Sequence, residues 1–202
     1  MRPDDDAAFA HVEDLAKALL YEGFVLYPYR ASSLKNQQRF PFGVLAPRRY
    51  AEAMGDAERW RLHLEVLVHA PDDTHLQAQV RCLRYASGDN EAREERIHLV
   101  GGRMGALRGA RGERHTDLDA EEDDRGRRFE PLALQSLLEV ERLERNVHRM
   151  TIEVRNVTEV ALSDGAQRGR PDRAERQAMV RRSAASVHVL LSVKDSATTT
   201  ED

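Results

Sequence analysis

The sequence predicts an α+β protein made mainly of antiparallel β-sheet, sandwich-like in form. An N-terminal helix and a short C-terminal helix before the last strand complete this fold class. Apolar and polar residues alternate in several segments, most clearly over residues 60–70. Residues rich in Pro, Gly, Asn and Asp separate these segments, as expected between antiparallel strands. Residues 1–194 are predicted to form one globular domain, followed by a disordered tail at 195–202.

The composition excludes several classes of protein. The 31 basic and 35 acidic residues are well mixed and give a net charge of −4, which argues against nucleic-acid binding. The single cysteine, Cys82, excludes an intramolecular disulfide and an all-cysteine metal site. No apolar run is long enough to span a membrane, and the N-terminus lacks the pattern of a signal peptide. We therefore expect a cytoplasmic protein without a cofactor or metal.

Residues 4–23 are predicted to form the N-terminal helix. Asp5 or Asp6 is suited to cap it, because an aspartate accepts hydrogen bonds from the free N–H groups of the first turn. Gly23 is the expected end of the helix. The apolar residues at helical spacing are Phe9, Val12, Leu15, Ala16, Leu19 and Leu20.

Two short strands, 24–29 and 40–46, are predicted next, with a polar segment from Pro47 to Gly55 after them. Residues 60–70 and 76–82 then alternate with a period of two, and the turn at 71–73 predicts that they form a hairpin. A third strand at 96–100 is expected to join this hairpin.

Residues 101–128 are rich in Gly, Arg, Asp and Glu and predict a long mobile polar loop. The pattern of 132–146 fits a helix or a strand, and we favour a strand at 137–143 paired with 148–156 through a turn at Arg145-Asn146. A polar loop at 163–171, a short helix at 172–182 and a last strand at 187–193 complete the prediction.

The histidines and Cys82 do not predict a catalytic or metal site. His63 and His69 would share a strand face, but six residues of strand separate them by roughly 20 Å, too far for one metal ion. Cys82 lies on an inward strand position, where a thiol acts as a small apolar group. Gly101-Gly102 lacks the residues that a phosphate-binding loop requires.

The loop between the two early strands is the candidate binding site. Its cations and polar groups suit a carboxylate, a phosphate or an acidic protein surface, since arginine offers forked donors. A purely structural loop, in which Asn36 and the serines satisfy backbone groups, is an equally good interpretation. The candidate binding residues are Arg30, Ser33, Lys35, Asn36 and Arg39.

The same region resembles a known family. Residues 20–30, the polar positions that follow and 42–45 resemble an uncharacterised bacterial family encoded beside actinobacterial-type high-affinity [NiFe]-hydrogenases. Residues 128–132, 148–156 and 186–191 are similar in order and spacing. The chain departs from that family after the last strand, where an acidic, proline-containing segment usually follows. The resemblance implies an accessory role in hydrogenase maturation or assembly and supplies no catalytic residues.

We therefore expect a non-catalytic interaction protein whose partner is a hydrogenase subunit or maturation factor. Two alternatives remain open at this point. One is a domain that binds a small anion or metabolite through the same loop, and the other is an enzyme with a site assembled from scattered residues.

Overall fold

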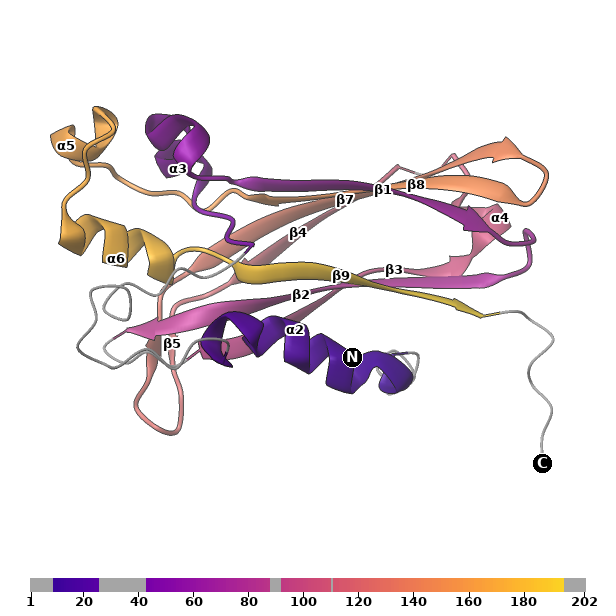
Figure 1. Ribbon diagram of the computed structural model, residues 1–202, viewed down its shortest axis with the longest axis horizontal. Helices are drawn as coiled ribbons and strands as arrows, with labels where there is room; N and C mark the ends of the chain where they lie inside the picture. The colour runs from indigo at the N-terminus through magenta and orange to yellow at the C-terminus, as the bar shows by residue number, and fades with distance from the viewer. Residues whose placement is uncertain (1–8, 26–42, 88–91, 110, 195–202) are drawn as a thin grey trace.

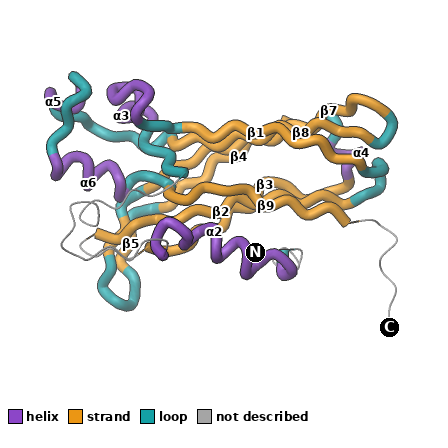
Figure 2. Tube along the Cα trace, in the orientation of Figure 1, coloured by secondary structure: helices purple, strands orange, loops and turns teal. Residues whose placement is uncertain are grey.

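The protein is a β-sandwich with helices at its periphery, which confirms the predicted fold class. The computed structural model describes residues 9–25, 43–87, 92–109 and 111–194. Two antiparallel sheets lie face to face, and helix α2 lies against the outer face of one of them (Figure 1, Figure 2). None of the described helices combines the length and apolar character needed to cross a bilayer.

Sheet 1 has four strands, each antiparallel to its neighbours. In spatial order they are β1 (Arg61–His69), β8 (Val147–Asn156), β7 (Leu132–Glu144) and β4 (Arg111–Leu118). Sheet 2 is centred on β2 (His75–Ser87). Strands β3 (Ala92–Arg103) and β9 (Ala185–Lys194) pair with β2, and the end of β2 also pairs with β6 (Arg128–Phe129), next to β5 (Glu121–Glu122).

The helical segments lie at the ends and on one face of this sandwich. On the outer face of sheet 2, a 3-10 turn at Ala10–Val12 leads into α2 (Glu13–Val25). The remaining helical segments are α3 (Arg48–Met54), a 3-10 turn at Gly55–Ala57, α4 (Met104–Leu107), α5 (Asp164–Gln167) and α6 (Arg173–Arg181).

The β7–β8 hairpin shows why the favoured strand interpretation of 132–146 is right. Leu134, Leu138 and Val140 point inward and are at most 5% exposed, so the period of two matches the two faces of a strand. The turn contains Asn146 at φ 62°, a left-handed conformation that asparagine adopts more easily than most residues. The residues of β7 pair with those of β8 from Leu134↔Asn156 to Glu144↔Val147.

The core lies between the two sheets as two adjoining apolar clusters. Its buried members come mainly from the inward faces of β2, β7 and β8, because only the middle strands are covered on both edges. The cluster members are Leu45, Val80, Cys82, Ile97, Leu132, Leu134, Val154 and Ala184 in one, and Ala70, Leu76, Ala78, Met104, Leu138, Val140, Met150 and Ile152 in the other.

A separate apolar cluster joins the helices at one end of the sandwich. Tyr50 and Ala51 of α3 pack with Val160 and with Met179 of α6, and the half-buried Trp60 packs against this group. The Arg48 guanidinium lies 4.7 Å from the centroid of the Trp60 ring. This arrangement ties the start of β1 to α3 and α6.

Two predictions about connectivity are wrong. Residues 60–70 and 76–82 form strands but not a hairpin, since β1 pairs with β8 and β2 pairs with β3 and β9. The Pro71–Thr74 connection instead carries the chain from one sheet to the other. Residues 101–128 are also not a continuous loop, because the end of β3, α4, β4, β5 and the start of β6 occupy them.

Several element boundaries also differ from prediction. Helix α2 continues through Gly23 to Val25, and it buries Ala16 and Leu20 while leaving Leu15 61% exposed. The polar segment before Gly55 contains α3, which the sequence pattern did not indicate. The predicted strand at 24–29 is helical at its start, and most of it lies outside the described residues.

The C-terminal part follows the prediction more closely. The short helix at 172–182 is confirmed as α6, whose first turn is capped by Asp172 accepting from the Glu175 N–H at 2.8 Å. The last strand is confirmed as β9. The loop predicted at 163–171 contains one short helix, α5.

Candidate functional site

The binding residues predicted from sequence belong to the loop between the two early predicted strands. Arg30, Ser33, Lys35, Asn36 and Arg39 all fall between residues 26 and 42, outside the described residues. Their proposed role in binding stays a prediction. The described residues do form a different site, which the sequence pattern did not indicate.

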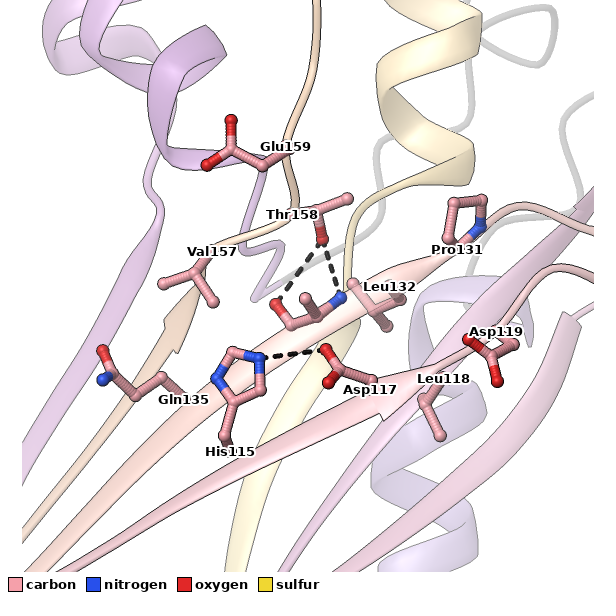
Figure 3. Close-up of a pocket in the computed structure, with 11 residues that line it drawn as sticks. His115, Asp117, Leu118, Asp119, Pro131, Leu132, Gln135, Val157, Thr158 and Glu159 are labelled. Atoms are coloured by element: carbon pink, nitrogen blue, oxygen red, sulfur yellow. Dashed lines mark hydrogen bonds and ion pairs between the residues drawn. The ribbon is translucent and has the colours of Figure 1, made fainter.

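This site, called the β4 pocket below, is a cavity of about 560 Å³ at the edge of sheet 1. It lies where the end of β4 meets the start of β7 and the segment that follows β8 (Figure 3). The lining residues are His115, Asp117, Leu118, Asp119, Pro131, Leu132, Ala133, Gln135, Val157, Thr158 and Glu159.

Pairing between β4 and β7 sets the floor of the pocket. His115 lies opposite Gln135 and Asp117 lies opposite Ala133 in this antiparallel register. Because side chains alternate along a strand, His115 and Asp117 share one face of β4, while Leu118 points the other way. The pocket thus presents polar groups from alternate positions of an edge strand.

A hydrogen-bonded segment forms the pocket wall. The Val157 N–H donates to the Ala133 carbonyl at 2.9 Å, and the Ala133 N–H donates to Thr158 Oγ1 at 2.9 Å. Thr158 Oγ1 also lies 2.6 Å from Oδ1 of the fully buried Asn156. The Asn156 amide in turn donates to the carbonyls of Leu45 and Arg182, so the wall is anchored to distant parts of the chain.

The pocket is acidic. Asp117, Asp119 and Glu159 contribute carboxylates, and His115 is the only basic side chain among the described lining residues. His115 Nε2 lies 2.9 Å from Asp117 Oδ1, and both side chains are more than half exposed. Figure 3 shows these two facing each other, with Glu159 on the opposite wall. Such an arrangement favours a cationic group.

The geometry supports binding better than nucleophilic catalysis. The pocket hydroxyl belongs to Thr158, which is 6% exposed and engaged with Asn156 and the backbone of Ala133. The Cys82 thiol is buried in the core, and burial raises its pKa to about 12, so it stays protonated at neutral pH. Across the described ranges, no three His, Cys, Asp or Glu side chains gather in a metal-binding arrangement.

Sequence analysis missed the β4 pocket because residues 101–128 were interpreted as a loop. A weak signal was present, since His115 and Asp117 alternate with Thr116 and Leu118 over the strand. The surrounding arginines, glycines and acidic residues hid this alternation. The contribution of Glu159 had no local signal, because it depends on long-range packing.

Comparisons with protein-family models, curated proteins and solved structures found no match to this chain. The geometry of the β4 pocket and the sequence resemblance are therefore the basis of the functional proposal below.

Proposed function

We propose that this chain is a non-catalytic interaction protein whose β4 pocket receives a lysine or arginine side chain of a protein partner. One observation supports this most directly. Two carboxylates of sheet 1 outside the pocket are paired with arginines, Glu153 with Arg155 and Glu141 with Arg149. In the pocket, Asp117 is paired with a histidine, and none of the described residues that line the cavity is a lysine or arginine.

A cationic side chain in the pocket would therefore pair with its carboxylates as Arg155 and Arg149 do with Glu153 and Glu141. An arginine can donate forked hydrogen bonds to a carboxylate, and a concave site removes part of the competing water. The pocket volume is within the usual range for ligand sites, about 300–1,000 Å³. We propose the charged end of one side chain as the anchor, with the rest of the partner lying over β4.

The family resemblance supports a choice of partner. We propose a [NiFe]-hydrogenase subunit or maturation factor, with this chain acting as an accessory during maturation or assembly. The proposed location is the cytoplasm, since a single buried cysteine fits a reducing compartment. The basic loop with Arg30, Lys35 and Arg39 is a second proposed contact, suited to an acidic part of the same partner.

Neither of the two alternative functions has a specific observation in its favour. A small anion would meet carboxylates in the β4 pocket, which is unfavourable, and the basic loop lies outside the described residues. An enzyme with a hydroxyl nucleophile would need a free hydroxyl in the pocket, where that of Thr158 is already committed.

The first test measures binding of a short arginine-rich peptide by isothermal titration calorimetry at low salt. Changing the pocket carboxylates together (D117N/D119N/E159Q) should weaken binding about tenfold or more, because the cation loses its counter-charges. The matched control, D124N/E139Q/E144Q, removes equal charge from exposed positions outside the pocket. Equal affinity for the two triple variants would show that the pocket is not the cation site.

The second test captures partners with the tagged full-length chain in cells that make such a hydrogenase. The pocket triple variant and R30A/K35A/R39A should each reduce recovery of hydrogenase subunits or maturation factors, with thermal stability nearly unchanged. Recovery that is the same for the wild type and both variants would contradict the proposed contacts.

A further inference from the structure

Strand β1 is an edge strand that lacks three of the features that usually protect an edge from pairing with other chains. Its nine residues contain no proline, and its pairing with β8 has no bulge. No charged side chain of β1 points inward, because its inward positions hold Leu62, Leu64, Val66 and Val68. Natural sheets often block an exposed edge with such features or with charged side chains, of which β1 has only Arg61 and Glu65. Among the described residues, β8 is the only strand that pairs with β1, so the other edge of β1 can accept a further strand.

The other sheet edges are better protected. Strands β3 and β9 both have a register shift in their pairing with β2, which twists an edge away from a second strand. Half of the residues of strand β4 are charged, and its Arg114 guanidinium donates to the His98 carbonyl of β3, which joins the two sheets on that side. On the β1 side, no hydrogen bond between β1 and β9 is found among the described residues.

The β1 side of the sandwich is also incompletely packed. Strands β1 and β9 are the edges on the same side of the sandwich (Figure 1). In the middle strands, Val80 and Ile152 are fully buried, whereas Val193 of β9 is 43% exposed. The inward residues that are only half-buried are Leu62, Leu64, Val66, Val68, Val187, Val189 and Leu191. An apolar seam therefore runs along the open side.

The charges of β1 identify what fits this edge. Its outward residues are Arg61, His63, Glu65, Leu67 and His69 in order, so residues 61–67 are complementary to the same residues of a second copy that runs in the opposite direction about Leu64. In that register, His63 of each copy lies opposite Glu65 of the other copy. Cross-strand pairs of opposite character stabilise antiparallel sheets. Leu67, which is 67% exposed, would lie under the aliphatic stem of Arg61 from the second copy.

We propose that two copies of this chain form a symmetric dimer by antiparallel pairing of their β1 strands, with the two-fold axis at Leu64. Sheet 1 then continues across both copies, and residues 61–67 overlap. Leu62 lies opposite Val66 of the second copy, so the two apolar seams meet and lose contact with water.

Neighbouring registers are less favourable. An axis at Glu65 would place two Glu65 carboxylates opposite each other, and like charges directly opposite destabilise a sheet. An axis at Val66 would place His63 opposite His69 and Glu65 opposite Leu67, so Glu65 would face no basic residue of the second copy. An axis at His63 would place Arg61 opposite Glu65, but it would pair only residues 61–65 of β1, against 61–67 for an axis at Leu64. Charge and the length of the overlap together select Leu64.

Analytical ultracentrifugation over a concentration series tests the dimer. The wild type should form dimers, and E65K should raise the dimer dissociation constant about tenfold or more, because the introduced lysine then faces His63. The double variant H63E/E65K restores opposite charges in reversed order and should recover the dimer. E139K makes the same charge change on the outer face of β7, away from the edge, and should dimerise like the wild type.

A wild type that stays monomeric at high micromolar concentration would overturn the proposal. A dimer weakened equally by E65K and E139K, or not recovered by H63E/E65K, would overturn the β1 interface. Oxidative cross-linking tests the position of the axis, because a cysteine on the two-fold axis lies opposite the same cysteine of the second copy. L64C should cross-link faster than E65C, and the reverse order would overturn the assigned register.

Discussion

Strand β2 carries two fully buried arginines, one on each of its faces, and their charges are balanced in different ways. Arg84 points between the sheets, where Nη2 donates to the Asp119 carbonyl and, at 2.7 Å, to that of Glu130. Its Nη1 lies 3.0 Å from a Glu121 carboxylate oxygen. Its guanidinium is also 5.6 Å from the centroid of the buried Phe129 ring. Arg84 thus holds the segment around β5 and β6 in place mainly through backbone groups.

Arg81 points to the opposite face, under helix α2. Its Nη2 donates to Glu13 of α2 at 2.7 Å, and its Nε donates to Gln79 at 2.7 Å. Nη1 has no hydrogen-bond acceptor among the described residues and lies 3.4 Å from Glu94. The attachment of α2 to sheet 2 therefore depends on carboxylates, which lose their charge when they are protonated in acid. The contacts of Arg84 include backbone carbonyls, which do not titrate.

This comparison teaches that two buried charges on one strand have different structural consequences. Arg84 organises a connection within the sandwich, so its loss should affect the core. Arg81 connects a separate helix to the sheet, so its loss should mainly release that helix. Three variants sharpen the contrast.

The largest effect is expected for R84M, which should lower the free energy of unfolding by roughly 3–5 kcal/mol. The variant leaves the carbonyls of Asp119 and Glu130 without their donor at the end of the core. Urea denaturation followed by far-UV circular dichroism measures the change. R149M, which removes an exposed arginine paired with Glu141, is the control and should cost less than about 1 kcal/mol. A loss no greater than that of R149M would contradict the assigned role.

R81M should lower the free energy of unfolding less, by roughly 1–3 kcal/mol, because the Glu13 side chain is 23% exposed and can be hydrated. Hydrogen exchange should show faster exchange in α2 than in β7 and β8. A double-mutant cycle with E13Q measures the coupling of the two side chains. Zero coupling would show that their contact does not stabilise the attachment of α2.

The smallest effect is expected for E13Q, about 1 kcal/mol at neutral pH. The hydrogen bond from Arg81, supported by Arg96, lowers the pKa of Glu13 below its ordinary value of 4.5. A lowered pKa contributes stability that is complete above 4.5 and is lost as the pH falls through the folded-state value. The stability difference between wild type and E13Q should therefore vanish in acid. A difference that is constant with pH would exclude this ion pair as its source.

Local sequence patterns predicted most of the strands but not their partners. The alternation over β1 and β2 is a property of neighbouring residues, so both strands were found. The short turn between β1 and β2 predicts a hairpin. The apolar face of each strand is buried equally well when the two strands lie in opposite sheets, as they do here. Pairing of β1 with β8 is a long-range contact that no local pattern records.

Charged strands were harder to recognise than apolar ones. Strand β4 has few large apolar residues because it is an edge strand with one face in water, so its composition resembled a loop. The buried Arg81 and Arg84 were also unexpected, since isolated arginines normally indicate an exposed surface. The β4 pocket combines a polar edge strand with a distant connecting segment, and so was not predicted.

The position of Trp60 has a practical consequence for spectroscopy. It is the only tryptophan of the chain, and it packs with α3 and α6 at one end rather than between the two sheets. Tryptophan fluorescence would therefore report on that helical end, whereas far-UV circular dichroism reports on the secondary structure of the whole protein, strands included. Coincident transitions from the two signals would show that the end and the sandwich melt as one cooperative unit, and separated transitions would show two.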